Sequence, residues 1–144
     1  MFSFMESELQ AAENCRNRVQ ANCTPIVHVV AHIPPGVFEK TPNFTWFRDE
    51  YNKKYLDITV RYKDTIKWMF YGHHHTDTFH LIKVWELLHG ENFPQNGTTT
   101  VQCSFMAPAV TPWFSSLAGA GANNPAFRIY EIEDDTNFKI NDIK

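Results

Sequence analysis

Apolar residues at helical spacing predict two helices. The first stripe recurs every three or four positions with glutamates between its members, and its helix is expected to end near residues 22–25. The second, longer stripe predicts a helix from about residue 43 to residue 63, with charged residues on the opposite face. The first stripe is Phe2, Met5, Leu9 and Ala12, and the second is Phe47, Tyr51, Tyr55, Ile58 and Tyr62.

Continuous apolar runs predict the strands. The β-branched run over residues 26–31 is typical of a strand covered on both faces, and it stops at His32 because Pro34 and Pro35 cannot extend a central strand. A second strand is expected from Thr65 to Tyr71 and ends at Gly72. Further strands are expected over residues 78–87, 98–106, 126–131 and 136–140, with a turn at Asn96-Gly97 and a loop over 119–125.

This order of elements predicts an α+β fold with an α/β-like first part. A strand–helix–strand unit comes first, and a set of antiparallel strands follows it. The 144 residues are 43% hydrophobic with a net charge of −3, which fits one folded domain over residues 1–144 and gives no basic footprint for nucleic acid. No apolar run is long enough to span a membrane, and the first residues lack the pattern of a signal peptide. The chain is therefore expected to begin inside a domain.

Histidines follow two of the predicted strands at the point where each strand ends. His73 and His75 are two positions apart, so in extended backbone their rings point to the same side and can reach one metal or two adjacent metals. His74 is then expected to face solvent. His32 ends the other strand, and if the two strands are neighbours in a parallel sheet the three rings converge at one edge. Asp77 continues the same alternation, and its carboxylate could orient one of the rings.

The competing interpretation is structural, because a histidine at a strand end is often only a hydrogen-bonded residue. Three further histidines, at positions 28, 80 and 89, show no partner pattern and are interpreted as ordinary. The combination of two strand ends, each with a turn rich in glycine or proline, is more specific than either motif alone.

The segments that carry these histidines resemble the calcineurin-like metallophosphoesterases, and more narrowly their acid sphingomyelinase and sphingomyelinase-like phosphodiesterase branch. The main segments are Ala-His-Ile-Pro-Pro-Gly at 31–36 and Phe-Tyr-Gly-His-His-His-Thr-Asp at 70–77. Residues 4–9, 105–112 and 123–130 support the resemblance, which covers nearly the whole chain. It implies the C-terminal half of a catalytic domain, and so part of a four-layer αββα sandwich.

The resemblance also implies a role for individual residues. His32 and His73 match ligands of one zinc ion, and His75 matches a ligand of the other. Trp113 matches an aromatic residue near the choline headgroup in acid sphingomyelinase, although an aromatic residue there could simply belong to the core. The family's upstream motifs, Asp-x-His, Gly-Asp-x-x-Asp and Gly-Asn-His, do not occur in these 144 residues. Two zinc ions are expected in the full domain and at most one here.

The expected function is metal-dependent hydrolysis of phosphodiesters, like that of a sphingomyelin phosphodiesterase, with the chain as a fragment that is inactive alone. One alternative is an inactive truncated paralogue that binds a lipid headgroup or a protein. Another is a mononuclear three-histidine zinc site. The expected partners are a phosphodiester, with sphingomyelin and nucleotides both open as substrates, and the missing N-terminal half of the domain.

Cysteines and glycosylation sequons indicate in which cellular compartment the chain is expected. Cys15 and Cys23 could pair if the chain is secreted, while Cys103 is as readily a buried free thiol. Asn-x-Thr sequons predict glycosylation at Asn22, Asn43 and Asn96, in tension with the absent signal peptide. The resemblance implies a secreted or lysosomal glycoprotein.

Overall fold

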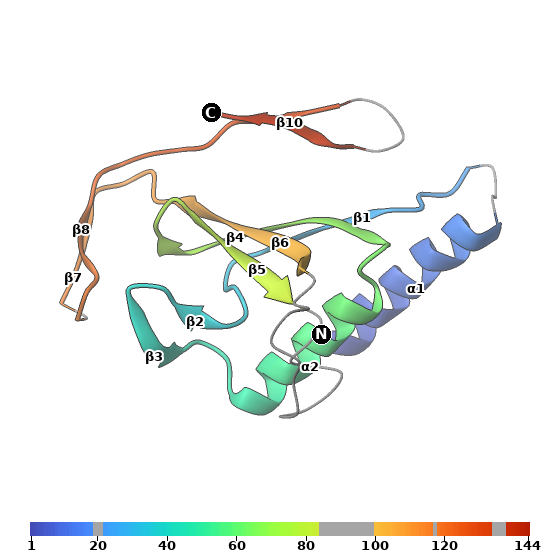
Figure 1. Cartoon of the computed structure of the whole chain (residues 1–144), viewed down its shortest axis with the longest axis horizontal. Helices are drawn as coiled ribbons and strands as arrows, with labels where there is room; N and C mark the ends of the chain where they lie inside the picture. The colour runs from blue at the N-terminus through green and yellow to red at the C-terminus, as the bar shows by residue number, and fades with distance from the viewer. Residues whose placement is uncertain (19–21, 84–99, 117, 134–137) are drawn as a thin grey trace.

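A computed structural model describes residues 1–18, 22–83, 100–116, 118–133 and 138–144 of the chain. It is a mixed α+β fold in which one four-stranded sheet carries both helices on one side and a short hairpin on the other (Figure 1). This agrees with the predicted fold class and is consistent with part of a sandwich. The elements are α1 (Phe2–Arg18), β1 (Val27–Ala31), β2 (Val37–Phe38), β3 (Thr41–Thr45), α2 (Asp49–Arg61), β4 (Ile66–His75), β5 (Thr78–Lys83), β6 (Thr100–Pro108), β7 (Trp113–Ser115), β8 (Gly121–Asn123), β9 (Tyr130–Ile132) and β10 (Ile140–Ile143).

The central sheet has the strand order β1-β4-β6-β5. β1 and β4 run parallel and are joined through α2, which confirms the predicted strand–helix–strand unit. β5 and β6 are antiparallel, as expected for consecutive strands. β6 also pairs with β4, and that pairing is parallel, with a register shift between Tyr71 and His75. The later strands therefore extend the parallel part of the sheet as well as forming an antiparallel pair.

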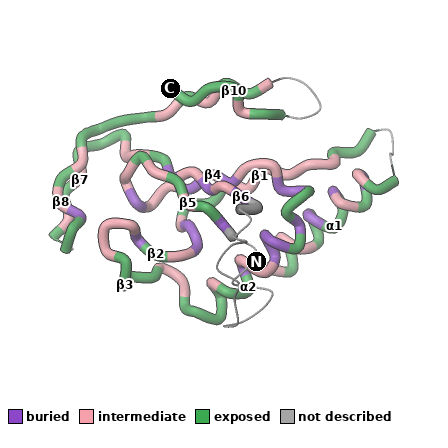
Figure 2. Tube along the Cα trace, in the orientation of Figure 1, coloured by how far each residue is buried: buried purple, intermediate pink, exposed green. Residues whose placement is uncertain are grey.

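The core lies between the two helices and the sheet (Figure 2). Both helices place one apolar stripe on the sheet, as their sequence spacing predicts, with Leu9 and Ile58 each 1% exposed. The hydroxyls of Tyr55 on α2 and Tyr71 on β4 lie 2.6 Å apart and satisfy each other inside this core. Burial of both rings raises the pKa of each tyrosine.

An aromatic cluster covers the opposite face of the sheet. Phe70 of β4, Phe105 of β6 and Tyr130 of β9 pack with ring centroids 4.9–6.0 Å apart. The Trp68 indole N–H donates to the carbonyl oxygen of Phe138, which ties the β9–β10 hairpin to β4. His28 of β1 stacks on the ring of Phe70 at the edge of this cluster.

Several predicted boundaries differ from the structure. The helix expected from residue 43 begins at Asp49, because Thr41–Thr45 pairs with β2 instead. The strand expected to end at Tyr71 continues through the histidines to His75. The last strands shrink to Tyr130–Ile132 and Ile140–Ile143, and the expected loop over 119–125 contains β8. Residues 84–87, 98–99 and 136–137, the Asn96-Gly97 turn and His89 lie outside the described residues.

No helix in the described ranges is both long enough and apolar enough to cross a membrane.

Candidate functional site

The histidine motifs meet at one edge of the sheet, where two parallel strands end. Ala31, the last residue of β1, is in register with Tyr71 of β4, so the chain that follows each strand leaves the sheet at the same place. The Gly72 N–H then donates to the carbonyl oxygen of His32 over 3.0 Å. The two strands are therefore parallel neighbours, which is the condition under which the histidine rings were expected to converge.

His32 and His73 form a close pair. Nε2 of His32 lies 3.2 Å from Nδ1 of His73, and the ring planes are 79° apart. Two ring lone pairs repel at this distance, so either one ring donates a proton to the other or a cation lies between them. Nε2 of His73 is buried without a hydrogen-bond partner. Desolvation lowers the pKa of His73, and the charges of His32 and His75 lower it further. The neutral form that binds metals is thus favoured.

His75 lies beside this pair but does not join it. Its ring packs against Trp113, with centroids 4.7 Å apart and planes at 77°, and its Nδ1 is buried without a partner. In the described part of the chain no third ligand atom lies within 4.8 Å of both His32 Nε2 and His73 Nδ1. The structure therefore brings two of the three predicted ligands together and places the third within electrostatic range of His73.

The backbone explains why simple alternation does not describe this motif. His73 and His75 have φ angles of 66° and 57°, in the left-handed region that residues with a side chain seldom adopt. The assumption of extended backbone from Gly72 to His75 is therefore wrong. The register shift between β4 and β6 falls in this same segment, so the rings are aimed by an irregular strand end.

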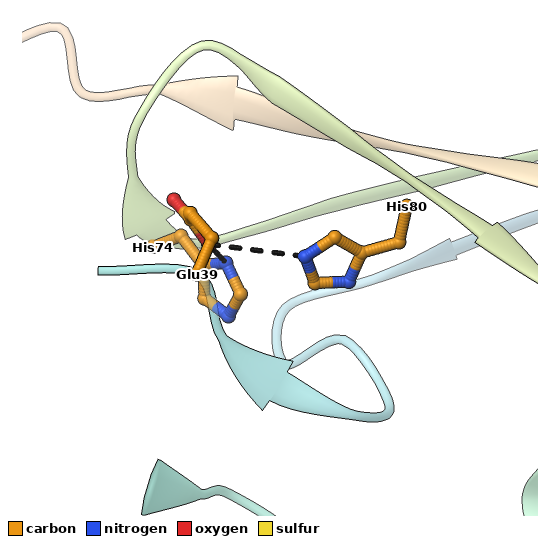
Figure 3. Close-up of side chains that lie close together, drawn as sticks. All are labelled: Glu39, His74 and His80. Atoms are coloured by element: carbon orange, nitrogen blue, oxygen red, sulfur yellow. Dashed lines mark ion pairs between the residues drawn. The ribbon is translucent and has the colours of Figure 1, made fainter. Parts of the chain in front are cut away.

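His74 is buried, and the expectation that it faces solvent is wrong. It is 1% exposed, and its Nε2 accepts a 2.8 Å hydrogen bond from the Trp46 indole N–H. Its Nδ1 lies 2.6 Å from a carboxylate oxygen of Glu39 (Figure 3). Desolvation lowers the pKa of His74, and the Glu39 charge opposes that shift.

His80 is the second histidine near Glu39, and unlike His74 it is partly exposed. Its Nε2 lies 3.8 Å from the same Glu39 oxygen, while the other Glu39 oxygen accepts a hydrogen bond from Thr76. Glu39, His74 and His80 place three potential ligand atoms within 4.8 Å of one another, and so form a possible metal-binding group. Sequence reasoning missed this cluster, because Glu39 follows a two-residue strand and nothing in its spacing links it to β4.

The structure does not support a role for Asp77 in orienting a histidine ring. Its carboxylate pairs with the guanidinium of Arg128. That guanidinium also donates to the Tyr130 hydroxyl and lies over the Phe105 ring, so it is fixed by the aromatic cluster. The Asp77–Arg128 pair therefore joins the end of the histidine segment to the C-terminal part of the chain.

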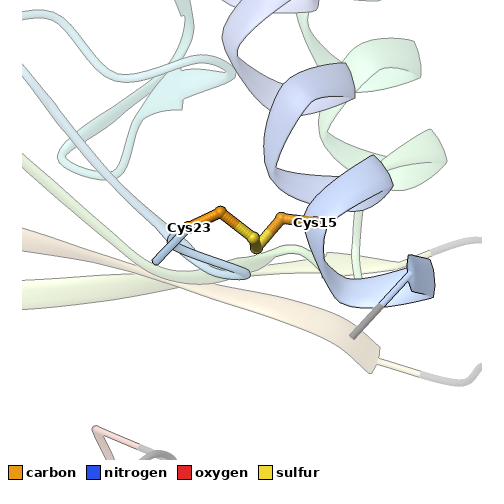
Figure 4. Close-up of a disulfide and its surroundings, with 2 residues drawn as sticks. All are labelled: Cys15 and Cys23. Carbon is orange, nitrogen blue, oxygen red and sulfur yellow. A yellow bond between two sulfur atoms is a disulfide. The ribbon is translucent and has the colours of Figure 1, made fainter. Parts of the chain in front are cut away.

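The cysteines and the sequon asparagines have defined surroundings in the described residues. Cys15 of α1 and Cys23 form a disulfide (Figure 4), whereas Cys103 is a half-buried free thiol. Asn22 and Asn43 are exposed, as glycosylation requires. The third sequon asparagine, Asn96, lies outside the described residues.

Comparison with known proteins finds several relatives whose names describe phosphodiesterases. The chain is 40% identical over 110 residues to mouse acid sphingomyelinase-like phosphodiesterase 3b, which covers 75% of the chain and 22% of that protein. It is 30% identical over 142 residues to a human cyclic GMP-AMP phosphodiesterase, covering 99% of the chain and 27% of the relative. The chain is 36% identical over 105 residues to sphingomyelinase phosphodiesterase C of Dictyostelium discoideum, which covers 73% of the chain and 22% of that protein.

No family model matches the chain. The chain spans about a quarter of the length of the relatives it matches. Within that span the identity is 30–40% over most of the chain. The 142-residue match covers 99% of the chain and so spans both strands that lead to the histidines. The chain is therefore homologous to a segment of the sphingomyelinase-like phosphodiesterases.

Proposed function

We propose that the chain supplies the histidine part of a metal site that hydrolyses phosphodiesters. The observation that carries this proposal is the 3.2 Å separation between His32 Nε2 and His73 Nδ1. Tetrahedral zinc with Zn–N distances of about 2.0–2.1 Å holds two nitrogen ligands about 3.3–3.4 Å apart. The pair is thus spaced as two ligands of one zinc ion would be.

The donor set fits zinc in two further respects. Neutral imidazole is a favoured zinc ligand, and the environment of His73 favours its neutral form. His75 Nδ1 is buried without a partner, which leaves a further ring nitrogen available at this edge. When bound, zinc polarises phosphoryl oxygens and lowers the pKa of water. The chain's own part is to hold the histidine rings in place. The Trp113 ring, which packs beside His75, is the candidate surface for contact with a group of the substrate.

We expect the 144-residue chain alone to hold at most one zinc ion, weakly, and to turn over phosphodiesters poorly or not at all. Two dications close together repel each other and need a bridging anion, which histidines do not provide. The family motifs that carry carboxylates are not in these residues. The names of the relatives leave sphingomyelin and cyclic dinucleotides both open as substrates.

The test is metal analysis of the purified full chain beside hydrolysis of bis(p-nitrophenyl) phosphate. We expect up to one zinc per chain, lost in His32→Ala and in His73→Ala and kept in the control His28→Gln, which lies away from the site. Zinc uptake that both site variants retain would overturn the metal proposal. Two tightly bound zinc ions with clear turnover would instead overturn the expectation that the chain alone is incomplete.

A second candidate function is a non-catalytic module that binds a lipid headgroup or a protein. The described residues form a sheet with a buried core, which is compatible with such a module. Binding of phosphocholine or of sphingomyelin vesicles without any turnover, in a chain that carries no zinc, would support this module over the enzyme.

We also propose that the chain is a secreted or lysosomal glycoprotein. The Cys15–Cys23 disulfide and the exposure of Asn22 and Asn43 support this proposal, because disulfides persist in oxidising compartments. Expression in mammalian cells followed by glycosidase treatment tests it. A mass unchanged by the glycosidase would count against glycosylation.

A further inference from the structure

Three side chains form a continuous polar chain beneath the histidine edge. The Trp46 indole N–H donates to His74 Nε2 over 2.8 Å, and His74 Nδ1 lies 2.6 Å from Glu39 Oε2. The other Glu39 oxygen accepts from Thr76, which fixes the carboxylate at both ends. Because the His74 side chain is fully buried and Glu39 Oε2 is buried as well, solvent cannot replace the two contacts of the His74 ring.

The Trp46 donor decides where the His74 proton lies. An indole nitrogen can only donate, so His74 Nε2 must present a lone pair to it. A neutral imidazole carries one proton, which is then on Nδ1 and faces Glu39. The Nδ1–H direction is not that of a well-aligned hydrogen bond. Even so, a ring nitrogen and a carboxylate oxygen 2.6 Å apart repel unless a proton or a cation lies between them.

The same donor argues against a metal ion in this cluster. Metal binding at His74 Nδ1 would move the ring proton to Nε2, where it would face the indole N–H across 2.8 Å. In addition, the 2.6 Å between His74 and Glu39 is shorter than the roughly 3.3 Å that separates two ligands of tetrahedral zinc. The cluster is therefore better described as a chain of close polar contacts than as a metal site.

The outer end of this chain touches a proposed zinc ligand. The Trp46 ring packs edge-on against His73, with centroids 4.2 Å apart and planes at 80°. Phe44 packs on Trp46 with centroids 4.6 Å apart, so the indole is held by a neighbouring aromatic ring as well. His73 needs such support, because its left-handed backbone does not aim its ring as a regular strand would.

We propose that Glu39, His74 and Trp46 are positioning residues that hold the His73 ring beside His32. The Trp46 N–H sets the tautomer of His74. Glu39 holds the orientation of the His74 ring through the contact at Nδ1. His74 anchors the indole, and the indole supports the His73 ring. This inference rests on the proposed metal site. It concerns Glu39, His74 and Trp46, and none of these three residues binds the metal or the substrate.

The test compares two tryptophan variants of the full chain by Co²⁺ titration, with visible absorption reporting the coordination. Trp46→Phe keeps an aromatic ring and deletes the N–H, which leaves His74 Nε2 unpaired. Trp68→Phe is the matched control, because its indole N–H donates over the same 2.8 Å to a carbonyl oxygen on the far face of the sheet. We expect Trp46→Phe to weaken Co²⁺ binding about 10–100-fold, the range for contacts that orient metal-binding histidines. Trp68→Phe should bind as the wild type does.

A second measurement tests the contacts among Trp46, His74 and Glu39 in the absence of metal. In ¹⁵N NMR of the wild type we expect His74 to be protonated at Nδ1, with a coupling across the hydrogen bond from Trp46 Nε1 to His74 Nε2. Should Trp46→Phe fail to fold, Glu39→Gln takes its place, with an expected Co²⁺ affinity between those of the wild type and Trp46→Phe.

The possible outcomes distinguish the positioning role from the proposed zinc site. Equal Co²⁺ affinity in the wild type and the folded Trp46→Phe variant would overturn the positioning role and leave the zinc site standing. A His74 proton on Nε2 would overturn the tautomer and with it the positioning role. No Co²⁺ binding by the wild type would overturn both proposals.

Discussion

Gly72 packs directly against His32. A β-carbon built on Gly72 would lie 3.3 Å from His32 Nδ1, closer than nearly all carbon contacts of that kind. The φ angle of Gly72 is not the reason for a glycine here, since only Gly36, Gly119 and Gly121 have positive φ among the described glycines. Gly72 is therefore needed for the close approach of the two strand ends, which brings His32 to His73.

Gly72→Ala should weaken metal binding more than it weakens the fold. The added methyl group pushes the exposed His32 ring away from His73, so we expect zinc or Co²⁺ affinity to fall about tenfold. The free energy of unfolding should change by less than about 1 kcal/mol, because an exposed ring can shift. Metal titration and thermal unfolding of the same samples check both parts. Unchanged affinity would show that the contact does not set the His32 position.

The parallel arrangement of β1 and β4 could be predicted from sequence for a specific reason. A β-branched run that stops at Pro34 and Pro35, a helix, and a second apolar run describe a crossover unit, and such units place strands parallel. That topology places the ends of the two strands, and with them His32 and His73, at the same edge of the sheet. The pairing of Cys15 with Cys23 was likewise within reach, as one of the alternatives that the sequence left open.

The surroundings of His74 could not be predicted in this way. Sequence alternation assumes extended backbone, but His73 and His75 have left-handed φ angles. Glu39 and Trp46 reach His74 from the β2–β3 segment, which the sequence pattern assigned partly to a helix. The burial of His74 depends on that tertiary contact, and no local period encodes it.

Removal of one hydroxyl from the buried tyrosine pair should destabilise the protein. Tyr55 and Tyr71 satisfy each other across 2.6 Å, so Tyr55→Phe leaves the Tyr71 hydroxyl buried with only the Met69 sulfur, 3.6 Å away, as a weak acceptor. We expect each single variant to lose about 1–3 kcal/mol in the free energy of unfolding. The double variant should lose less than the sum, since it leaves no orphaned hydroxyl. Urea unfolding of all four proteins measures this coupling, and strict additivity would contradict it.

His28 should contribute to the loss of stability in mild acid. Desolvation lowers its pKa below 6.5, and the charge of Lys67 lowers it further. The unfolded chain therefore binds a proton at a higher pH than the folded chain does. The stability that His28 provides is complete above its unfolded pKa and is lost as the pH falls through 6.5 toward the folded pKa.

His28→Gln removes this titration and leaves the other histidines in place. We expect the melting temperature of the variant to fall less than that of the wild type between about pH 7 and pH 5. Burial also lowers the pKa of His80, so some acid sensitivity should persist in both proteins. Parallel pH curves for the two proteins would show that His28 titrates alike in the folded and unfolded chains.

Reduction of the Cys15–Cys23 disulfide should destabilise the protein by a predictable amount. The bond closes a short loop with a sequence separation of 8, for which the entropy of the unfolded chain predicts about 2.5 kcal/mol. Urea unfolding with and without dithiothreitol measures the difference. Cys103→Ser is the control, because it removes the free thiol and should keep the full response to the reductant. A double Cys15→Ser, Cys23→Ser variant should show no response. Equal unfolding midpoints for the oxidised and reduced wild type would mean that the bond adds nothing to the stability of the fold.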